Sequence, residues 1–139
     1  MYAVVRIRGS VGLDKKIKDT LSMLRLERVN HCVLIDKTPH MEGMVKKVRS
    51  YITWGEVDSK ILEKLVEKRG RLPGNKKLEP KKAKEVARSI EKDKKVKEIK
   101  PVFRLSPPSR GFKAIRKDYP RGALGYRGEK INDLLKRMM

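Results

Sequence analysis

Residues 31–36 read His-Cys-Val-Leu-Ile-Asp, a continuous apolar run that predicts a central strand buried on both faces of a sheet. Before it, residues 2–8 (YAVVRIR) alternate, which is typical of a strand with one apolar face and one partly basic face. After it, residues 51–57 (YITWGEV) are rich in aromatic and β-branched residues and predict a third strand. These three strands form the centre of the predicted fold.

Two helices are predicted between the three strands. Asp14 can cap a helix that runs to about Arg25, with apolar residues at helical spacing. Thr38 followed by Pro39 is typical of a helix start, because a hydroxyl cap precedes a proline at the first helical position. The resulting order, β-α-β-α-β, gives residues 1–57 two helices, enough to cover one face of the sheet. Since the central strand is apolar on both faces, we expect part of the remaining chain to cover the other face.

Three further helices are predicted in the second part of the chain. The first follows Asp58 and stops at Gly70, and the second begins at Pro80. The third covers residues 129–138, where apolar residues recur at helical spacing. Residues 102–105, after a proline, predict a short extended piece. We therefore expect a body over residues 1–57 and a largely helical extension over residues 58–139.

The positive charge of the chain gathers in that extension. The 139 residues include 37 Lys and Arg against 17 Asp and Glu, a net charge of +20. Residues 1–57 hold 11 basic and 6 acidic residues, and residues 58–139 hold 26 and 11. In residues 106–128, which we call the basic arm, arginines stand among glycines, prolines and tyrosines, and we expect no core within this arm. So much repulsion within one small chain favours a polyanionic partner.

The composition argues against catalysis, metal binding and membrane insertion. The histidines are His31 and His40, and no acid–base or nucleophilic constellation accompanies them. His31 and Cys32 are strand neighbours that point to opposite faces, so they cannot share a metal ion. We expect Cys32 to be an inert buried thiol, typical of a reducing cytoplasm. No run of 18 apolar residues is present, so we expect no membrane span. We also expect no membrane partner, no cofactor, no small-molecule substrate and no catalytic residue.

Folded RNA is the predicted polyanion. The sequence lacks the patterns of helix-turn-helix, zinc-finger and basic-zipper proteins, and the aromatic strand signature of an RNA-recognition motif. Arginine makes bidentate contacts with phosphate and stacks on bases, which favours shape and phosphate recognition of RNA. The candidate RNA-binding residues are Arg6, Arg8, Lys15, Lys16, Arg25, Arg28, Lys46, Lys47, Arg69, Arg71, Arg104, Arg110, Lys113, Arg116, Lys117, Arg121, Tyr126, Arg127 and Lys130.

Some conspicuous residues also have a plain structural interpretation. Trp54 is more typical of a core than of a base-stacking platform, and His40 is expected to be solvated. The lysine-rich stretch at residues 76–99 fits a solvated helix face and an RNA-binding surface equally well. Residues 122–128 (GALGYRG) lack the Lys-Ser/Thr ending of a phosphate-binding loop, so they favour a flexible approach to a polyanion over nucleotide binding.

Seven blocks of the sequence carry a resemblance to a known family. They are residues 6–9 (RIRG), 19–26 (DTLSMLRL), 28–32 (RVNHC), 51–57 (YITWGEV), 69–72 (RGRL), 100–105 (KPVFRL) and 122–131 (GALGYRGEKI). In these blocks, over nearly its whole length, the chain resembles the archaeal large-subunit ribosomal protein L-thirty family, which is related to eukaryotic large-subunit protein L-seven. The chain departs from the family at Glu27 and Ser106, where histidine is usual, and in the lysine-rich stretch.

The resemblance implies an α+β fold of the ferredoxin-like kind, with a three-stranded antiparallel sheet, two helices on one face and a basic helical extension. It also implies a structural protein of the large ribosomal subunit in the cytoplasm, with large-subunit ribosomal RNA, 5S ribosomal RNA and neighbouring ribosomal proteins as partners. Three other interpretations stay open: a free RNA chaperone or regulator, an enzyme acting on RNA, and a DNA-compacting protein.

Overall fold

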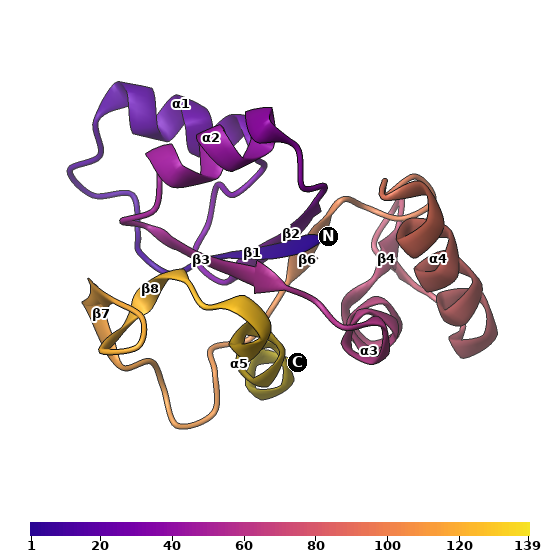
Figure 1. The fold of residues 1–139 in the computed structure, drawn as a ribbon. Helices are drawn as coiled ribbons and strands as arrows, with labels where there is room; N and C mark the ends of the chain where they lie inside the picture. The colour runs from indigo at the N-terminus through magenta and orange to yellow at the C-terminus, as the bar shows by residue number, and fades with distance from the viewer.

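A mixed six-stranded sheet runs through the middle of the molecule, with helices on both of its faces (Figure 1). The computed structural model describes residues 1–139. The strands lie in the order β6-β2-β1-β3-β8-β7. Their bounds are β1 Tyr2–Arg6, β2 His31–Ile35, β3 Ile52–Glu56, β6 Val102–Arg104, β7 Ala114–Asp118 and β8 Gly122–Tyr126.

The three strands predicted from the sequence form the centre of this sheet. β1 lies between β2 and β3 and is antiparallel to both, with Val4 opposite Val33 on one side and Trp54 on the other. The predicted sheet of three strands is too small, because β6 adds antiparallel to β2, and β8 and β7 add parallel beyond β3. The added strands carry weak sequence signals: β6 has three residues, and β8 begins with a glycine and contains another.

The first face of the sheet is covered by α1 (Lys15–Met23) and α2 (Pro39–Lys47), as the sequence predicts. The hydroxyl oxygen of Thr38 accepts a hydrogen bond from the backbone N–H of Met41 at 3.3 Å, which confirms the predicted start of α2. Asp14 stands at the start of α1, but its side chain makes no capping hydrogen bond. A cluster of ten buried residues fills this layer, and Trp54 is one of them, as expected.

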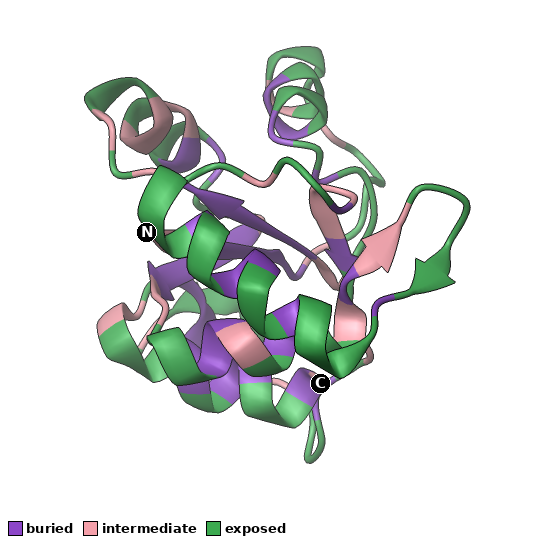
Figure 2. Cartoon of the chain, turned by 90° about the vertical axis from the view of Figure 1, so that its right-hand side faces the viewer, coloured by how far each residue is buried: buried purple, intermediate pink, exposed green.

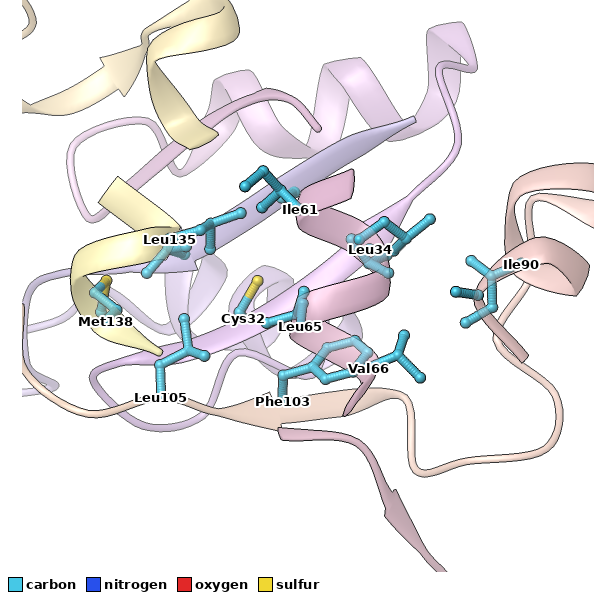
Figure 3. Packing of buried hydrophobic residues seen from close by; sticks show 14 of the residues in the cluster. Cys32, Leu34, Ile61, Leu65, Val66, Ile90, Phe103, Leu105, Leu135 and Met138 are labelled. Atoms are coloured by element: carbon cyan, nitrogen blue, oxygen red, sulfur yellow. The ribbon is translucent and has the colours of Figure 1, made fainter. Parts of the chain in front are cut away.

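The second face is covered by the C-terminal extension, which confirms the prediction that this part of the chain buries it. α3 (Ser59–Arg69) and α5 (Ile131–Met138) lie below the sheet in Figure 1, and α4 (Pro80–Asp93) packs on α3. Twenty buried residues form this core, and Figure 3 shows Cys32 and Phe103 among side chains of α3 and α5. The hairpin of β4 (Arg71–Leu72) and β5 (Lys76–Lys77) and the turn η1 (Gly128–Lys130) complete the elements.

Burial follows these layers. Figure 2 shows buried strands between helices whose outward faces are exposed, and a β4–β5 hairpin that extends into solvent. None of the helices is both long and apolar enough to cross a membrane.

The basic arm contributes two strands to the edge of the sheet. All five residues of β7 are exposed, as expected for the arm, but β8 is buried over Gly122–Gly125. Ala123 and Leu124 of β8 form a small core with Ile7. Glycine makes this possible, because a Cβ atom at position 122 would overlap the carbonyl oxygen of Lys117. The arm therefore has no core of its own, as expected, but β8 shares a small core with Ile7.

The single thiol of the chain should be chemically silent in the native state. Cys32 is fully buried, and burial raises the pKa of its thiol to about 12. Because the thiolate is the reactive form, we expect no alkylation by iodoacetamide at pH 8 in native buffer and complete alkylation in denaturant. Mass spectrometry of the intact protein measures both. Native labelling at the rate of a free cysteine would contradict the burial of this strand.

Candidate RNA interface

Arg6, one of the predicted RNA-binding residues, is buried and has a structural role. Its side chain is fully buried, and the guanidinium donates hydrogen bonds to the carbonyl oxygens of Leu26 and Glu27 at 2.7 Å. It also donates to the Arg8 carbonyl and to the Ser10 hydroxyl, both at 2.9 Å. Burial lowers the pKa of Arg6 from a value so high that the group stays charged at neutral pH. The side chain thus ties the loop after α1 to the end of β1.

A pocket between the basic arm and α5 gathers the largest group of predicted residues. It has a volume of about 340 Å³, and we call it the arm pocket. Its walls carry five basic side chains against one acidic side chain, Asp133, together with two aromatic rings, Phe112 and Tyr119. The five basic residues are Arg110, Lys113, Arg127, Lys130 and Arg137.

Two arginines of the arm pocket are held by the protein itself. Arg127 is half-buried and donates to the hydroxyl of Thr53 at 2.9 Å and to the carbonyl of Ala123 at 2.6 Å. Its guanidinium also lies 5.3 Å from the centre of the Tyr119 ring. Burial, and then the charge of Arg137, lower the pKa of Arg127. Arg127 is therefore part of the wall, whereas Arg110, Lys113 and Lys130 are exposed and free to meet a ligand.

Arg137 was missed by sequence reasoning. It lies in the last turn of α5, where a basic residue is unremarkable because it complements the helix dipole. In the structure its guanidinium donates to the carbonyls of Ser109 and Gly111, at 3.3 and 3.2 Å. Those contacts fasten the arm to α5 and leave a fifth positive charge in the pocket.

A second basic pocket lies at the edge strand β6. It has a volume of about 280 Å³, and we call it the strand pocket. It brings together the predicted residues Arg69, Arg71 and Arg104, adds Lys100, and contains no acidic side chain. Arg69 is anchored there, since it donates to the Ser106 hydroxyl at 2.6 Å and to the Met139 carbonyl at 3.1 Å.

One segment of chain joins the two pockets. Between Arg104 and Lys113 it runs along the C-terminal end of α5, where the Ser106 N–H donates to the Met138 carbonyl and the Ser109 N–H to the Arg137 carbonyl, both at 3.1 Å. We call the arm pocket, this segment and the strand pocket together the basic band.

The remaining candidates lie elsewhere. α1 and α2 cover the sheet face opposite α5, so the structure does not bring their lysines to the basic band (Figure 1). Arg8 is partly buried, with its guanidinium 5.0 Å from the centre of the Tyr51 ring. The exposed candidates outside the band are Lys15, Lys16, Arg25, Arg28, Lys46 and Lys47 around α1 and α2, and Arg116, Lys117, Arg121 and Tyr126 on or beside β7 and β8.

The basic band offers charge and hydrogen-bond donors but no acid–base pair. His31 lies opposite Arg104 in the β2–β6 pair. Burial, together with the charges of Arg104 and Arg28, lowers the pKa of His31, so its imidazole is neutral at pH 7. No group of three or more His, Cys, Asp or Glu side chains is placed to hold a metal ion. The chemistry available here is therefore the binding of anions.

Comparison with known proteins points to one family. Residues 2–52 match the family model described as ribosomal protein L30p/L7e. A protein of Methanococcus maripaludis named large ribosomal subunit protein uL30 is 51% identical over 99% of both chains. Proteins of the same name from Archaeoglobus fulgidus and Methanosphaera stadtmanae are 45% and 44% identical, over 99% and 100% of both chains.

Proposed function

Because this chain belongs to the ribosomal protein L30p/L7e family, we propose that its basic band binds large-subunit ribosomal RNA and stabilises the fold of that RNA. The chain is a structural, non-enzymatic protein of the large ribosomal subunit, and its place of action is the cytoplasmic ribosome. Neighbouring ribosomal proteins are its further partners.

The observation that carries the RNA proposal is the charge of the two joined pockets. They hold nine basic side chains against one carboxylate. Like charges held this close repel one another, and a polyanion whose phosphates reach both pockets removes that repulsion. Arg110 and Arg104 present planar forks suited to bidentate phosphate contacts. The lysines act as point charges.

The shape of the band suits a place where RNA strands converge. Its pockets are concave, and the segment between them keeps its backbone on α5 through hydrogen bonds of 3.1 Å. Contacts made by an already ordered segment cost little conformational entropy on binding. Arg116 and Lys117 of the exposed strand β7 lie outside the band and stay further candidates for RNA contact. The band therefore offers phosphates a largely preformed site.

We further propose that the site on the ribosome lies near 5S ribosomal RNA. What supports this is the resemblance of residues 58–139 to the extension of archaeal and eukaryotic relatives. The band is built mainly from that extension, since all nine of its basic residues lie after residue 58.

Sedimentation tests the proposal. In a sucrose gradient of cell lysate at high salt, we expect the protein in the large-subunit peak at about one copy per particle, because loosely held basic proteins are stripped under these conditions. Quantitative immunoblotting of the fractions measures it. Recovery at the top of the gradient, or spread over all RNA, would favour a free RNA chaperone and would overturn the ribosomal proposal.

A further inference from the structure

A third pocket differs in kind from the basic band. Its lining residues come from α2 and from β1, β3 and β8, and its volume is about 240 Å³. We call it the aromatic pocket. Its lining residues are Tyr2, Glu42, Lys46, Trp54 and Tyr126.

Strand register places the three aromatic rings on one face. Trp54 is opposite Tyr126 in the β3–β8 pair and opposite Val4 in the β1–β3 pair. Tyr2 lies two residues before Val4 in β1, so its side chain points to the same face of the sheet as Val4. The ring centres of Tyr2 and Tyr126 are 6.3 Å apart, and those of Trp54 and Tyr126 are 6.1 Å apart. Three of the seven aromatic residues of the chain therefore meet at this point.

The rings differ in their exposure. Trp54 is 9% exposed and closes the floor of the pocket, whereas Tyr126 is 49% exposed. Tyr126 is packed on two rings and still offers much of its surface to solvent. An aromatic ring held in this way is a stacking platform whose orientation is fixed before a ligand arrives.

The polar groups of the aromatic pocket are balanced in charge. One oxygen of the Glu42 carboxylate accepts a hydrogen bond from the Tyr2 hydroxyl at 3.2 Å, which leaves the other oxygen able to accept from a ligand. Lys46 follows one helical turn later and supplies a donor. With one carboxylate and one ammonium group, the pocket is poorly suited to a phosphate. It suits a flat, uncharged group with both donors and acceptors on its edge.

We propose that the aromatic pocket takes one unpaired base of the RNA, stacked on Tyr126, an assignment that rests on the RNA binding proposed above. An exocyclic amino group of the base donates to Glu42, and a carbonyl oxygen or ring nitrogen accepts from Lys46. The base therefore carries an amino group, as adenine, guanine and cytosine do and uracil does not. An arginine side chain of a neighbouring protein fits less well, because a guanidinium has donors only and offers no acceptor to Lys46.

Cross-linking by ultraviolet light tests the contact in the unaltered protein. The full chain is bound to large-subunit RNA extracted from ribosomes, irradiated at 254 nm and digested, and the linked peptides are identified by mass spectrometry. We expect a nucleotide on Tyr126, or on Tyr2 or Trp54 beside it, because such links form between stacked groups in direct contact. Cross-links confined to the basic band would overturn the base-binding proposal.

Variants at Tyr126 measure the contribution of the stack to affinity. Y126L keeps an apolar side chain but removes the ring, and we expect its Kd for the same RNA to rise about tenfold, within the usual range for base–aromatic stacking. Y126F keeps the ring and should lose less than about threefold. Y51L is the matched control, since Tyr51 lies outside all three pockets and its replacement should not change the Kd.

The outcomes separate this inference from the RNA proposal. If Y126L binds like the wild type and affinity still falls with salt, the base-binding proposal fails and the RNA proposal stands. If the wild type does not bind the RNA, both fail. If Y126L binds RNA normally but loses a neighbouring ribosomal protein in reconstituted subunits, the pocket takes a protein side chain and the base-binding proposal is wrong.

Discussion

Replacing Arg110, Lys113 and Lys130 together by alanine is expected to weaken binding to large-subunit RNA by about two to three orders of magnitude at 0.1 M salt. All three side chains are exposed around the arm pocket, and none is held by a hydrogen bond within the protein. Each phosphate contact adds about 0.9 of a decade to the affinity for every tenfold fall in salt, so three contacts add about 2.7 decades at 0.1 M relative to about 1 M salt. The fold should survive, because these side chains contribute nothing to the core.

The salt dependence is the most direct measurement of this effect. If the wild type contacts about six to ten phosphates, its affinity should fall by roughly three to five decades between 50 and 200 mM salt. In the triple variant, the slope of log affinity against log salt should be smaller by about three. Filter binding over a salt series gives both slopes. A wild-type affinity that did not respond to salt would contradict phosphate recognition.

A charge-matched control separates the pocket from the total charge. Lys81, Lys84 and Arg88 are exposed on α4, outside the basic band, and their replacement by alanine removes the same three charges. We expect the fold-increase in Kd of this control to be no more than about a tenth of the fold-increase measured for the pocket variant. Equal losses would mean that the charge of the whole chain, including the lysine-rich stretch, binds the RNA.

Replacing Arg6 by alanine is expected to lower the free energy of unfolding by about 3–5 kcal/mol. The carbonyls of Leu26, Glu27 and Arg8 would each lose their donor, and an unpaired buried polar group costs about 1–3 kcal/mol. Some of that cost is relieved where water reaches the partly buried carbonyls. Urea unfolding followed by circular dichroism measures the change.

Arg8 provides the matched control, since it is the same residue type two positions further along the chain. It makes one exposed hydrogen bond, to the Ser50 carbonyl at 3.2 Å, and lies over the Tyr51 ring. Its replacement by alanine should cost about 1 kcal/mol or less. A similar loss from both replacements would contradict the structural role given to Arg6.

The local pattern of the sequence determined the central strands, all the longer helices and the family. The signals that predict these elements each span only a few residues, so the structure they indicate does not depend on the rest of the chain. They are the alternation in residues 2–8, the apolar run in residues 31–36 and the proline after Thr38. The apolar run also indicated that the extension must cover the second face. The sequence likewise placed the positive charge in the extension, because charge is a property of composition.

Tertiary structure alone decided the sheet edges, the role of each arginine and the grouping of the rings. The sequence indicates the extended piece at residues 102–105 but not its partner. β6 pairs with β2, and β8 with β3, across about 70 residues of chain, and no local pattern specifies such a partner. Arg6 and Arg8 look alike in sequence, but only the loop after α1 surrounds Arg6 with carbonyls. Arg137 lies in the arm pocket because it hydrogen-bonds to Gly111, which is distant in sequence. Tyr126 packs against Tyr2 and Trp54, which are also distant from it in sequence. The periodicity of a sequence specifies the local conformation of a helix or a strand. A pocket forms only where strand register and packing bring distant segments together.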